Sequence, residues 1–214
     1  MASTEGIHWL GHDSFRVDGS VTLYIDPWKV GPGAPTADVI LVTHDHYDHL
    51  SLPDIKKLAG PRTVVVGPGP VTAQLSGLET VTVAAGDAVS VDGVGITAVP
   101  AYNTNKFREP GLTYHPQEAG HLGYVVELDG RRIYHAGDTD AIPEMAGVVC
   151  DVALLPVSGT FVMTADEAAT ACDMISAGVV VPMHYGTVAG SADDAVRLQE
   201  MCGVPVVVLP NENP

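Results

Sequence analysis

Short apolar runs bounded by Gly, Pro or Asp recur along the whole chain, and they predict a protein rich in β-strands. In the first half the predicted strands are Ile7-Leu10, Val21-Asp26, Ala37-Thr43, Thr63-Gly67, Thr80-Ala84, Ala88-Val91 and Gly95-Pro100. In the second half they are Leu122-Leu128, Arg131-Ala136, Val152-Val157, Val179-Pro182 and Val204-Leu209. Both halves of the chain are therefore predicted to contain a series of short strands.

Helices are predicted where a hydroxyl residue precedes an acidic residue by three positions, the pattern of an N-terminal capping box. The three pairs are Ser51 with Asp54, Thr164 with Glu167, and Ser191 with Asp194. Gly178 and Gly203 stand where the C-terminal caps of the last two helices are expected.

The strand patterns also predict the layers of the fold. Val39-Val42 and Val64-Val66 are uninterrupted apolar runs, typical of strands buried on both faces, so helices must cover the sheet. Two such halves packed sheet to sheet give an α/β (α+β) four-layer αββα sandwich. We expect residues 1-214 to form a single domain built from two similar halves, with one long irregular stretch over 101-120.

The composition and charge of the chain limit which molecules it can bind. With 46% hydrophobic residues the 214-residue chain can bury a large core, and its net charge of -16 argues against long nucleic acids and anionic membranes. Cys150, Cys172 and Cys202 have no CxxC spacing and predict buried thiols. The first residues carry no basic and apolar leader, and no run is long enough to span a membrane, so we expect a cytoplasmic protein.

The highest density of possible metal ligands lies directly after a predicted buried strand. His44, His46, Asp48 and His49 fall within six residues there. Alternate residues of an extended chain project to one side, so His44 and His46 can converge on one metal ion while Asp48 and His49 turn toward a second. The spacing therefore predicts two half-sites.

A metal site needs further ligands from distant parts of the chain. Asp138 follows the predicted strand Arg131-Ala136 within Gly137-Asp138-Thr139, and from there it can bridge two ions. His184 ends another predicted buried strand. Their shared placement at strand ends distinguishes them from ordinary turn residues.

These motifs resemble the metallo-β-lactamase superfamily: H-x-H-x-D-H, a later Gly-Asp-Thr and a C-terminal strand ending in His. The opening Trp9-Leu10-Gly11-His12 and the triplet Ile25-Asp26-Pro27 are similar to its branch of uncharacterised metal-dependent hydrolases related to ascorbate-phosphate lactonases. The resemblance spans nearly the whole chain. It implies that His44 and His46 bind the first metal.

The same resemblance implies that Asp48, His49 and His184 bind the second metal and that Asp138 bridges the two. Asp26 is then a carboxylate that holds the histidine cluster from behind. His12 resembles a family position near the site and is expected to contact the substrate or support a ligand, with a structural role as the equal alternative.

The superfamily usually takes a third histidine for the first metal from a loop before the Gly-Asp hairpin. Here that region offers Asn103, His115 and His121. We favour His115 because its His-Pro sequence in a Gly-flanked loop suits a projecting ligand. His121 lies so near a strand that the ladder can draw it in, and Asn is a poor zinc ligand.

Two adjacent cations activate water and polarise a carbonyl or phosphoryl oxygen, so hydrolysis is the expected reaction. Asp48 or Asp138 would orient the attacking water and accept its proton. A ligand set of His and Asp favours zinc, with manganese, iron, cobalt and nickel as alternatives.

Few basic residues are available to bind a substrate anion. Lys106 and Arg108 share the long loop with Asn103, and they could receive a phosphate or carboxylate, although scattered surface charge explains them equally well. We therefore predict a hydrolase for a small, anionic ester, lactone or amide.

Two other functions stay open at this stage. One is a phosphodiesterase or nuclease for short or cyclic nucleotides, since the same metal pair acts on phosphoryl centres. The other is a non-hydrolytic metal-binding or di-iron protein, since a fold does not settle function. The partner is expected to be a small molecule; the oligomeric state is not set, although the N-terminal strands could pair in a homo-oligomer.

Overall fold

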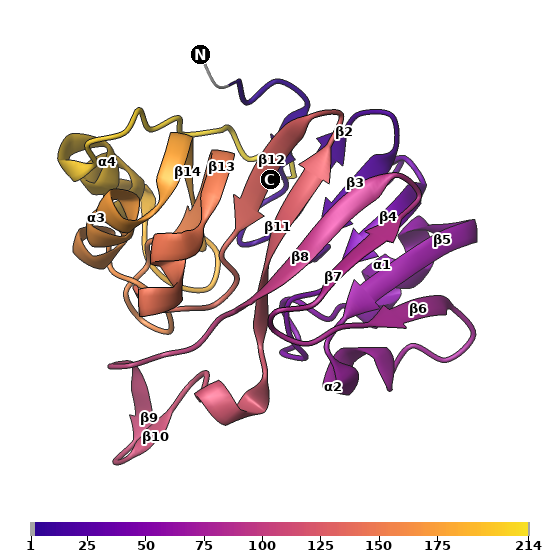
Figure 1. Ribbon diagram of the computed structural model, residues 1–214, viewed down its shortest axis with the longest axis horizontal. Coiled ribbons are helices and arrows are strands. Elements are labelled where there is room, and N and C mark those ends of the chain that lie inside the picture. Colours follow the sequence, from indigo (N-terminus) through magenta and orange to yellow (C-terminus); the bar gives the residue numbers. More distant parts are fainter. Residues whose placement is uncertain (1–2, 214) are drawn as a thin grey trace.

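Two six-stranded β-sheets face each other in the computed structural model, which describes residues 3–213 (Figure 1). The first sheet has the order β1 (Ile7–Trp9), β2 (Phe15–Asp18), β3 (Thr22–Ile25), β4 (Ala37–Leu41), β5 (Ala59–Gly67), β6 (Glu79–Thr82). The second has the order β14 (Ser176–Met183), β13 (Val149–Pro156), β12 (Arg131–His135), β11 (Leu122–Leu128), β8 (Val94–Pro100), β7 (Ala88–Val91). Each sheet therefore comes from one half of the chain.

Helices cover the outer face of each sheet. On the first sheet lie α1 (Leu52–Leu58) and the short α2 (Gly69–Thr72), and on the second lie α3 (Ala165–Met174) and α4 (Ala192–Met201) (Figure 1). Strand β4 is buried on both faces, which explains the helical cover. Val39 and Leu41 pack in the core between the sheets, while Ile40 and the following Val42 pack in the core under α1. The predicted four-layer αββα sandwich is confirmed.

The three predicted helix starts are also confirmed. Thr164 and Ser191 form complete capping boxes, and the Ser51 hydroxyl accepts the Asp54 N–H. The predicted cap at Gly178 is wrong: α3 ends at Met174, and Gly178 lies inside β14. Because Ile175 already turns into extended backbone, the helix leads directly into the strand.

One predicted strand does not form. Residues 204–209 form no strand and make only one isolated bridge, between Val206 and Val180. Pro205 lies inside this segment and Pro210 follows it, and neither can donate to a ladder. Conversely, β2 was not predicted, because its alternation of Phe15, Arg16 and Val17 is only four residues long.

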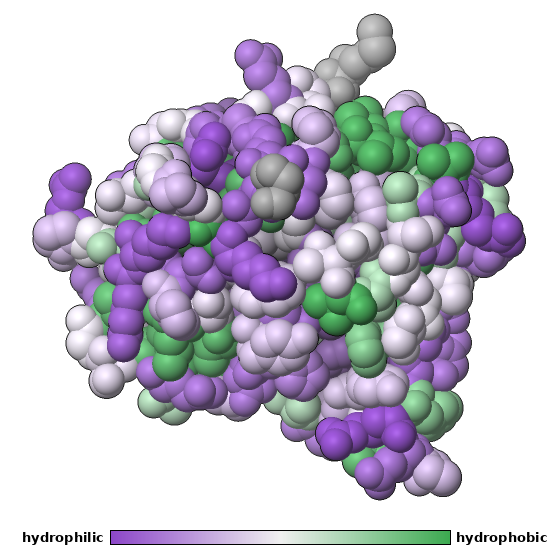
Figure 2. All heavy atoms as spheres, turned by 180° about the vertical axis from the view of Figure 1, so that it is seen from behind, coloured by the Kyte–Doolittle hydropathy of each residue, from purple (hydrophilic) through white to green (hydrophobic). Residues whose placement is uncertain are grey.

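The stretch 101–120, expected to be irregular, carries a small hairpin of β9 (Phe107–Glu109) and β10 (Leu112–Thr113). This hairpin projects from the body of the molecule, at the lower right of Figure 2, and exposes Phe107 and Leu112 beside Arg108 and Glu109. Over the described chain, no helix is long and apolar enough to cross a membrane. Cys150 and Cys172 are buried and Cys202 is partly buried, as free thiols.

Candidate metal centre

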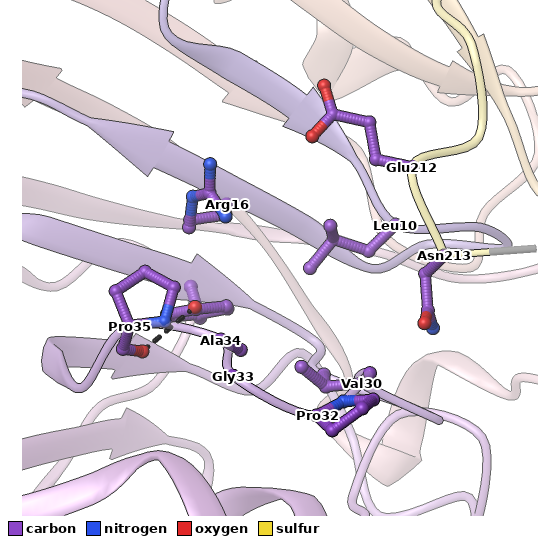
Figure 3. A pocket seen from close by; sticks show the side chains of 11 residues that line it. Leu10, Arg16, Val30, Pro32, Gly33, Ala34, Pro35, Glu212 and Asn213 are labelled. Atoms are coloured by element: carbon purple, nitrogen blue, oxygen red, sulfur yellow. Dashed lines mark hydrogen bonds between the residues drawn. The ribbon is translucent and has the colours of Figure 1, made fainter.

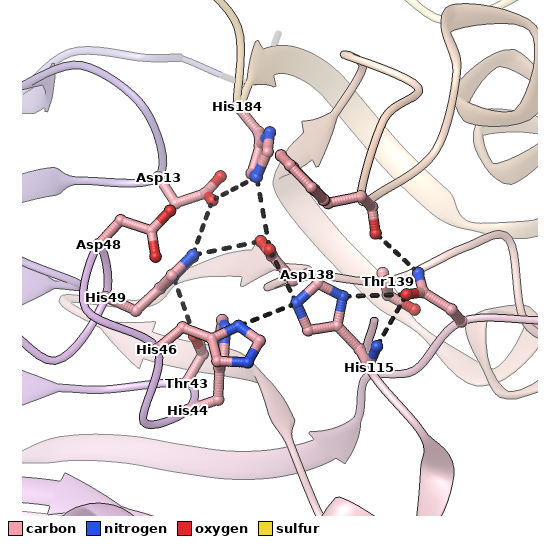
Figure 4. A network of polar contacts seen from close by, with 12 residues as sticks. Asp13, Thr43, His44, His46, Asp48, His49, His115, Asp138, Thr139 and His184 are labelled. Carbon is pink, nitrogen blue, oxygen red and sulfur yellow. Dashed lines mark hydrogen bonds and ion pairs between the residues drawn. The ribbon is translucent and has the colours of Figure 1, made fainter. Parts of the chain in front are cut away.

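Most of the predicted ligands converge at one edge of the sandwich because they follow strands of the two sheets, and His115 reaches the same edge from the stretch 101–120. The His44–His49 segment follows β4 of the first sheet, whereas Asp138 follows β12 and His184 follows β14 of the second. Figure 4 shows these side chains pointing toward one another across the gap between the sheets. The site is therefore built from both halves of the chain.

The first group of ligand atoms comes from three histidines. His44, His46 and His115 each offer a ring nitrogen within 4.8 Å of the others. His46 Nδ1 lies 2.9 Å from His44 Nε2 and 3.2 Å from His115 Nε2. His121 stays outside this group, and its ring stacks on His44 with centroids 4.6 Å apart. The geometry therefore favours His115 as the third nitrogen.

The second group contains His12, Asp13, His49 and His184. Asp13 Oδ2 lies 3.5 Å from His49 Nε2 and 3.9 Å from His184 Nε2. Zinc ligands about 2.0–2.1 Å from the ion in a tetrahedron lie about 3.3 Å apart, so these gaps suit a shared ion better than a hydrogen bond.

Asp138 lies between the two groups. Its Oδ2 is 3.2 Å from His115 Nε2 and 3.4 Å from His184 Nε2, and its Oδ1 is 3.4 Å from His49 Nε2. One carboxylate thus reaches a histidine of each group. This is the position that a bridging ligand requires.

Several buried polar atoms of the cluster have no hydrogen-bond partner within residues 3–213. They are His49 Nε2, Asp138 Oδ1, both carboxylate oxygens of Asp13 and His12 Nδ1. Leaving such atoms unpaired is costly unless something else binds them. The orphaned nitrogen and oxygen atoms fit divalent cations, which these residue types coordinate.

The tautomers of the histidines are set from outside the cluster. Thr43 Oγ1 donates to Asp26 and can therefore accept from His44 Nδ1 at 3.0 Å, while Asn103 Oδ1 accepts from His115 Nδ1 at 3.0 Å. Each ring then keeps an unprotonated Nε2 facing the centre. Such outer hydrogen bonds are typical of metal-binding histidines.

The second group is supported in the same way. Asp26 Oδ2 accepts from His49 Nδ1 at 2.7 Å, and Ser158 Oγ lies 2.8 Å from His184 Nδ1. Asp26 thus holds the cluster from behind. His12, Asp26 and His184 all adopt positive φ (52°, 45° and 57°), a sparsely populated conformation that is common at functional sites.

The two groups differ in electrostatics. Burial lowers the pKa of His44 and His46, and it lowers that of His115 to about 4, so these rings stay neutral as ligands must. Burial also opposes charge on His184, but Asp138 and Asp13 raise its pKa to about 9. Within the second group the shifts differ in direction, because burial lowers the pKa of His12 to about 4.

Asp48 is placed differently from the other predicted ligands. It belongs to neither group, and its Oδ2 accepts from His12 Nε2 at 3.1 Å. Burial raises the pKa of Asp48, but the hydrogen bond from His12 and the charge on His49 more than offset this effect and lower the pKa to about 2. Asp48 is therefore an ionised carboxylate beside the second group.

The predicted basic contacts do not reach the metal cluster. Lys106 Nζ pairs with Glu167 at 2.7 Å and Asp140 at 3.2 Å, and Arg108 lies on the projecting hairpin. Lys29 lies over the Trp28 ring, 4.0 Å from its centroid. These lysines are occupied by protein contacts rather than free for a substrate anion.

Asn103 is part of the scaffold. Its amide donates to Asp140 Oδ1 at 3.3 Å, and Asp140 Oδ2 accepts from the backbone N–H of Thr104 and Asn105. Asp140, two residues after Asp138, therefore anchors the loop that carries His115.

A pocket of about 240 Å³ opens onto the cluster. It is lined by His46, Tyr47, Asp48, Tyr114, His115, Asp138, Phe161, His184 and Val188. Three aromatic rings and one valine form its walls, and its two acidic residues, Asp48 and Asp138, lie at the metal cluster. Tyr47 and Tyr114 are among these rings, whereas Tyr185 stacks on Trp9 with centroids 4.8 Å apart.

A separate cavity of about 200 Å³ lies between residues 30–35 and the C-terminal tail (Figure 3). The charged side chains in its lining are Arg16, which pairs with Asp18, and Glu212, which contacts His8. No residue of the metal cluster lines this cavity.

Sequence reasoning missed Asp13 and Ser158. Asp13 lies in the turn between β1 and β2, where a polar residue ordinarily faces solvent, yet it is fully buried. Its position directly after His12 was the available signal. Ser158 has no motif of its own, and only the fold brings it to His184.

Comparison with known proteins identifies the family of this chain. The model of the β-lactamase superfamily domain matches residues 6–184. The metal-dependent hydrolase UPF0173 of Pyrococcus abyssi is 35% identical, with 95% of each chain covered. The chain belongs to the metallo-β-lactamase superfamily and is a metal-dependent hydrolase.

Solved structures share the fold. A protein of Parabacteroides distasonis is 32% identical with a TM-score of 0.82, covering 94% of this chain and 91% of that one. Igni18, a metallo hydrolase of Ignicoccus hospitalis, is 25% identical with a TM-score of 0.76, covering 96% and 94%.

Proposed function

We propose that this protein hydrolyses a small ester, lactone or amide with the help of two divalent metal ions. The observation that supports this most strongly is the pair of ligand groups on either side of Asp138, opening onto one pocket. His44, His46 and His115 would hold the first ion, and His49 and His184 would belong to the second. When bound, such a pair lowers the pKa of water and polarises a carbonyl oxygen.

Zinc is the ion we propose for the first group, because three neutral imidazoles are a common zinc ligand set. Manganese, iron, cobalt and nickel remain alternatives for the pair. The outer hydrogen bonds from Thr43 and Asn103 keep the ring nitrogens of this group available.

Within this proposal Asp48 moves the proton. Its carboxylate lines the pocket, is held by the His12 N–H and is ionised, so it can orient an attacking water and accept a proton from it. Asp138, facing both groups, is the alternative acceptor that the sequence suggested.

The pocket supports a substrate with an apolar portion. Tyr114 and Phe161 meet edge to face with centroids 4.8 Å apart and form one wall. Neither Lys106 nor Arg108 belongs to the described lining, so the expected anionic group gains no support from a basic side chain. We therefore propose that an acyl or alkyl group contacts the aromatic wall while the reacting carbonyl faces the cluster.

A panel of chromogenic esters, lactones and phosphodiesters would test the function, with protein stripped by EDTA and then reloaded with zinc. We expect stripping to abolish hydrolysis of an ester or lactone and reloading to restore it. Full activity after stripping would contradict the proposal, and activity confined to phosphodiesters would replace its substrate class.

His115→Ala and His121→Ala form a matched pair for the ligand set. We expect His115→Ala to lose bound zinc and His121→Ala to retain it. Full zinc retention in His115→Ala would remove this residue from the site.

A further inference from the structure

We propose that Asp13 is a direct ligand of the second metal ion, a role that neither the H-x-H-x-D-H motif nor the Gly-Asp-Thr motif supplies. The inference rests on the metal site proposed above and extends it. The second ion would then be held by His49, His184 and Asp13, with Asp138 between the two ions.

The position of the carboxylate carries this inference. Asp13 is fully buried, and neither of its oxygens has a hydrogen-bond partner in the part of the chain that the structure describes. Its Oδ2 faces His49 Nε2 at 3.5 Å and His184 Nε2 at 3.9 Å, and Figure 4 shows the three groups converging. A structural aspartate would be expected to accept hydrogen bonds, because a buried unpaired carboxylate is costly.

The backbone around Asp13 is fixed, as a preorganised ligand requires. The carbonyl of His12 accepts from the Trp9 indole N–H at 2.8 Å and from the His184 backbone N–H at 3.0 Å. The carbonyl of Asp13 lies 2.9 Å from His135 Nε2. These contacts tie the turn between β1 and β2 to β12 and to the end of β14, so the carboxylate is held at the cluster.

The position of Asp48 supports the same assignment. Its Oδ2 accepts from His12 Nε2 and lies outside the second ligand group. The two carboxylates therefore have different roles: Asp13 supplies a buried oxygen ligand, and Asp48 faces the pocket. His12, between them, positions Asp48.

The assignment also has a consequence for metal choice. The first group offers three nitrogens, whereas the second would offer two nitrogens and the oxygens of Asp13 and Asp138. Oxygen ligands favour harder ions such as manganese relative to zinc. We infer that the second position accepts manganese more readily than the first.

Titration of metal-stripped protein with zinc and with manganese would test this, comparing wild type, Asp13→Asn and Asp48→Asn. Asn is isosteric but removes the charge. We expect Asp13→Asn to weaken one of two ions at least tenfold, more for manganese than for zinc, and to leave the other ion unchanged. Cobalt-loaded protein should show altered visible absorption in Asp13→Asn and much less change in Asp48→Asn.

The outcomes distinguish failure of the Asp13 assignment from failure of the proposed function. If Asp13→Asn binds two ions as wild type does, Asp13 is not a ligand and the proposed function stands. If wild type binds fewer than two ions, both fail. Should Asp13→Asn not fold, a zinc-loaded wild-type crystal decides: an Asp13 oxygen about 2.0–2.2 Å from the ion is expected, and one beyond about 3 Å would overturn the assignment.

Discussion

Replacing Asp26 by Asn tests how the fold prepares His49 for a metal ion. Asp26 is fully buried and accepts three hydrogen bonds: from Thr43 N–H at 2.8 Å, from Thr43 Oγ1 at 2.6 Å and from His49 Nδ1 at 2.7 Å. Asn has the same shape and tolerates the positive φ of 45° at this position, so the backbone can be retained.

The amide reverses the two hydrogen bonds that Asp26 Oδ2 accepts, from Thr43 Oγ1 and from His49 Nδ1. Asn oxygen can still accept the Thr43 N–H, but its NH₂ group then faces His49 Nδ1 and favours the tautomer in which that nitrogen is unprotonated. The proton moves to Nε2, the atom that faces Asp13 and Asp138. The variant therefore places a proton where the ion should bind.

Loss of such an outer partner typically weakens metal binding about 10- to 100-fold, which corresponds to about 1.4–2.7 kcal/mol. We expect this loss for the second ion, which His49 would bind, and a smaller loss for the first, because Thr43 Oγ1 also contacts His44 Nδ1. Both affinities are measured by competition with a chelator of known affinity. Asp38→Asn is the matched control: Asp38 accepts the Thr22 N–H at 2.8 Å in β4, far from the cluster, and its loss should leave both affinities unchanged. Second-ion affinity within twofold of wild type in a folded Asp26→Asn protein would refute the reasoning.

Four further predictions concern the fold and the pocket. Gly137→Ala should lower stability more than Gly130→Ala. Both glycines have positive φ, where an alanine costs about 1–3 kcal/mol, but a Cβ at Gly137 would also lie 2.6 Å from the Leu122 carbonyl oxygen, whereas one at Gly130 meets nothing within 4 Å. Equal losses in denaturant titrations would contradict this prediction. Phe161→Ala should raise KM about tenfold for esters with a large apolar group and leave kcat and small esters little changed, because it removes part of the pocket wall; a fall in kcat alone would argue against a binding role. Burial raises the pKa of Glu167, but hydrogen bonds from Lys106 and the Thr164 N–H outweigh it and hold the pKa at about 2. Since the folded pKa is depressed, its stabilisation is present above about pH 4.5 and is lost as pH falls through about 2, so the melting-temperature gap between wild type and Glu167→Gln should narrow over that window and stay constant near neutrality; a gap that widens on acidification would contradict the sign. Heating metal-free protein should give one cooperative calorimetric transition, because both sheets share one core, and two separate transitions would contradict a single domain.

Much of the architecture could be predicted because local patterns and tertiary packing agree. Strands β7 and β11 have the predicted bounds, since alternation and flanking turns leave no ambiguity there. The capping boxes at Thr164 and Ser191 are local and form as expected. Residues 204–209 show the limit: their apolar run matches a strand, but prolines and the edge position leave it almost unpaired.

The site could be predicted where the ligands follow buried strands. His44, His46, His49, Asp138 and His184 come together for that reason. The contribution of Asp13 could not be predicted, since it depends on a turn being folded inward against two other elements. Lys106 shows the opposite error, because only the tertiary structure reveals that Glu167 and Asp140 already bind it.

The measurement that tests the central claim most directly is anomalous X-ray scattering at the zinc edge from a crystal of the zinc-loaded protein. We predict two peaks, one among His44, His46 and His115 and the other among His49, His184 and Asp13, with Asp138 between them. A single peak, or peaks away from these groups, would contradict a binuclear centre at this site.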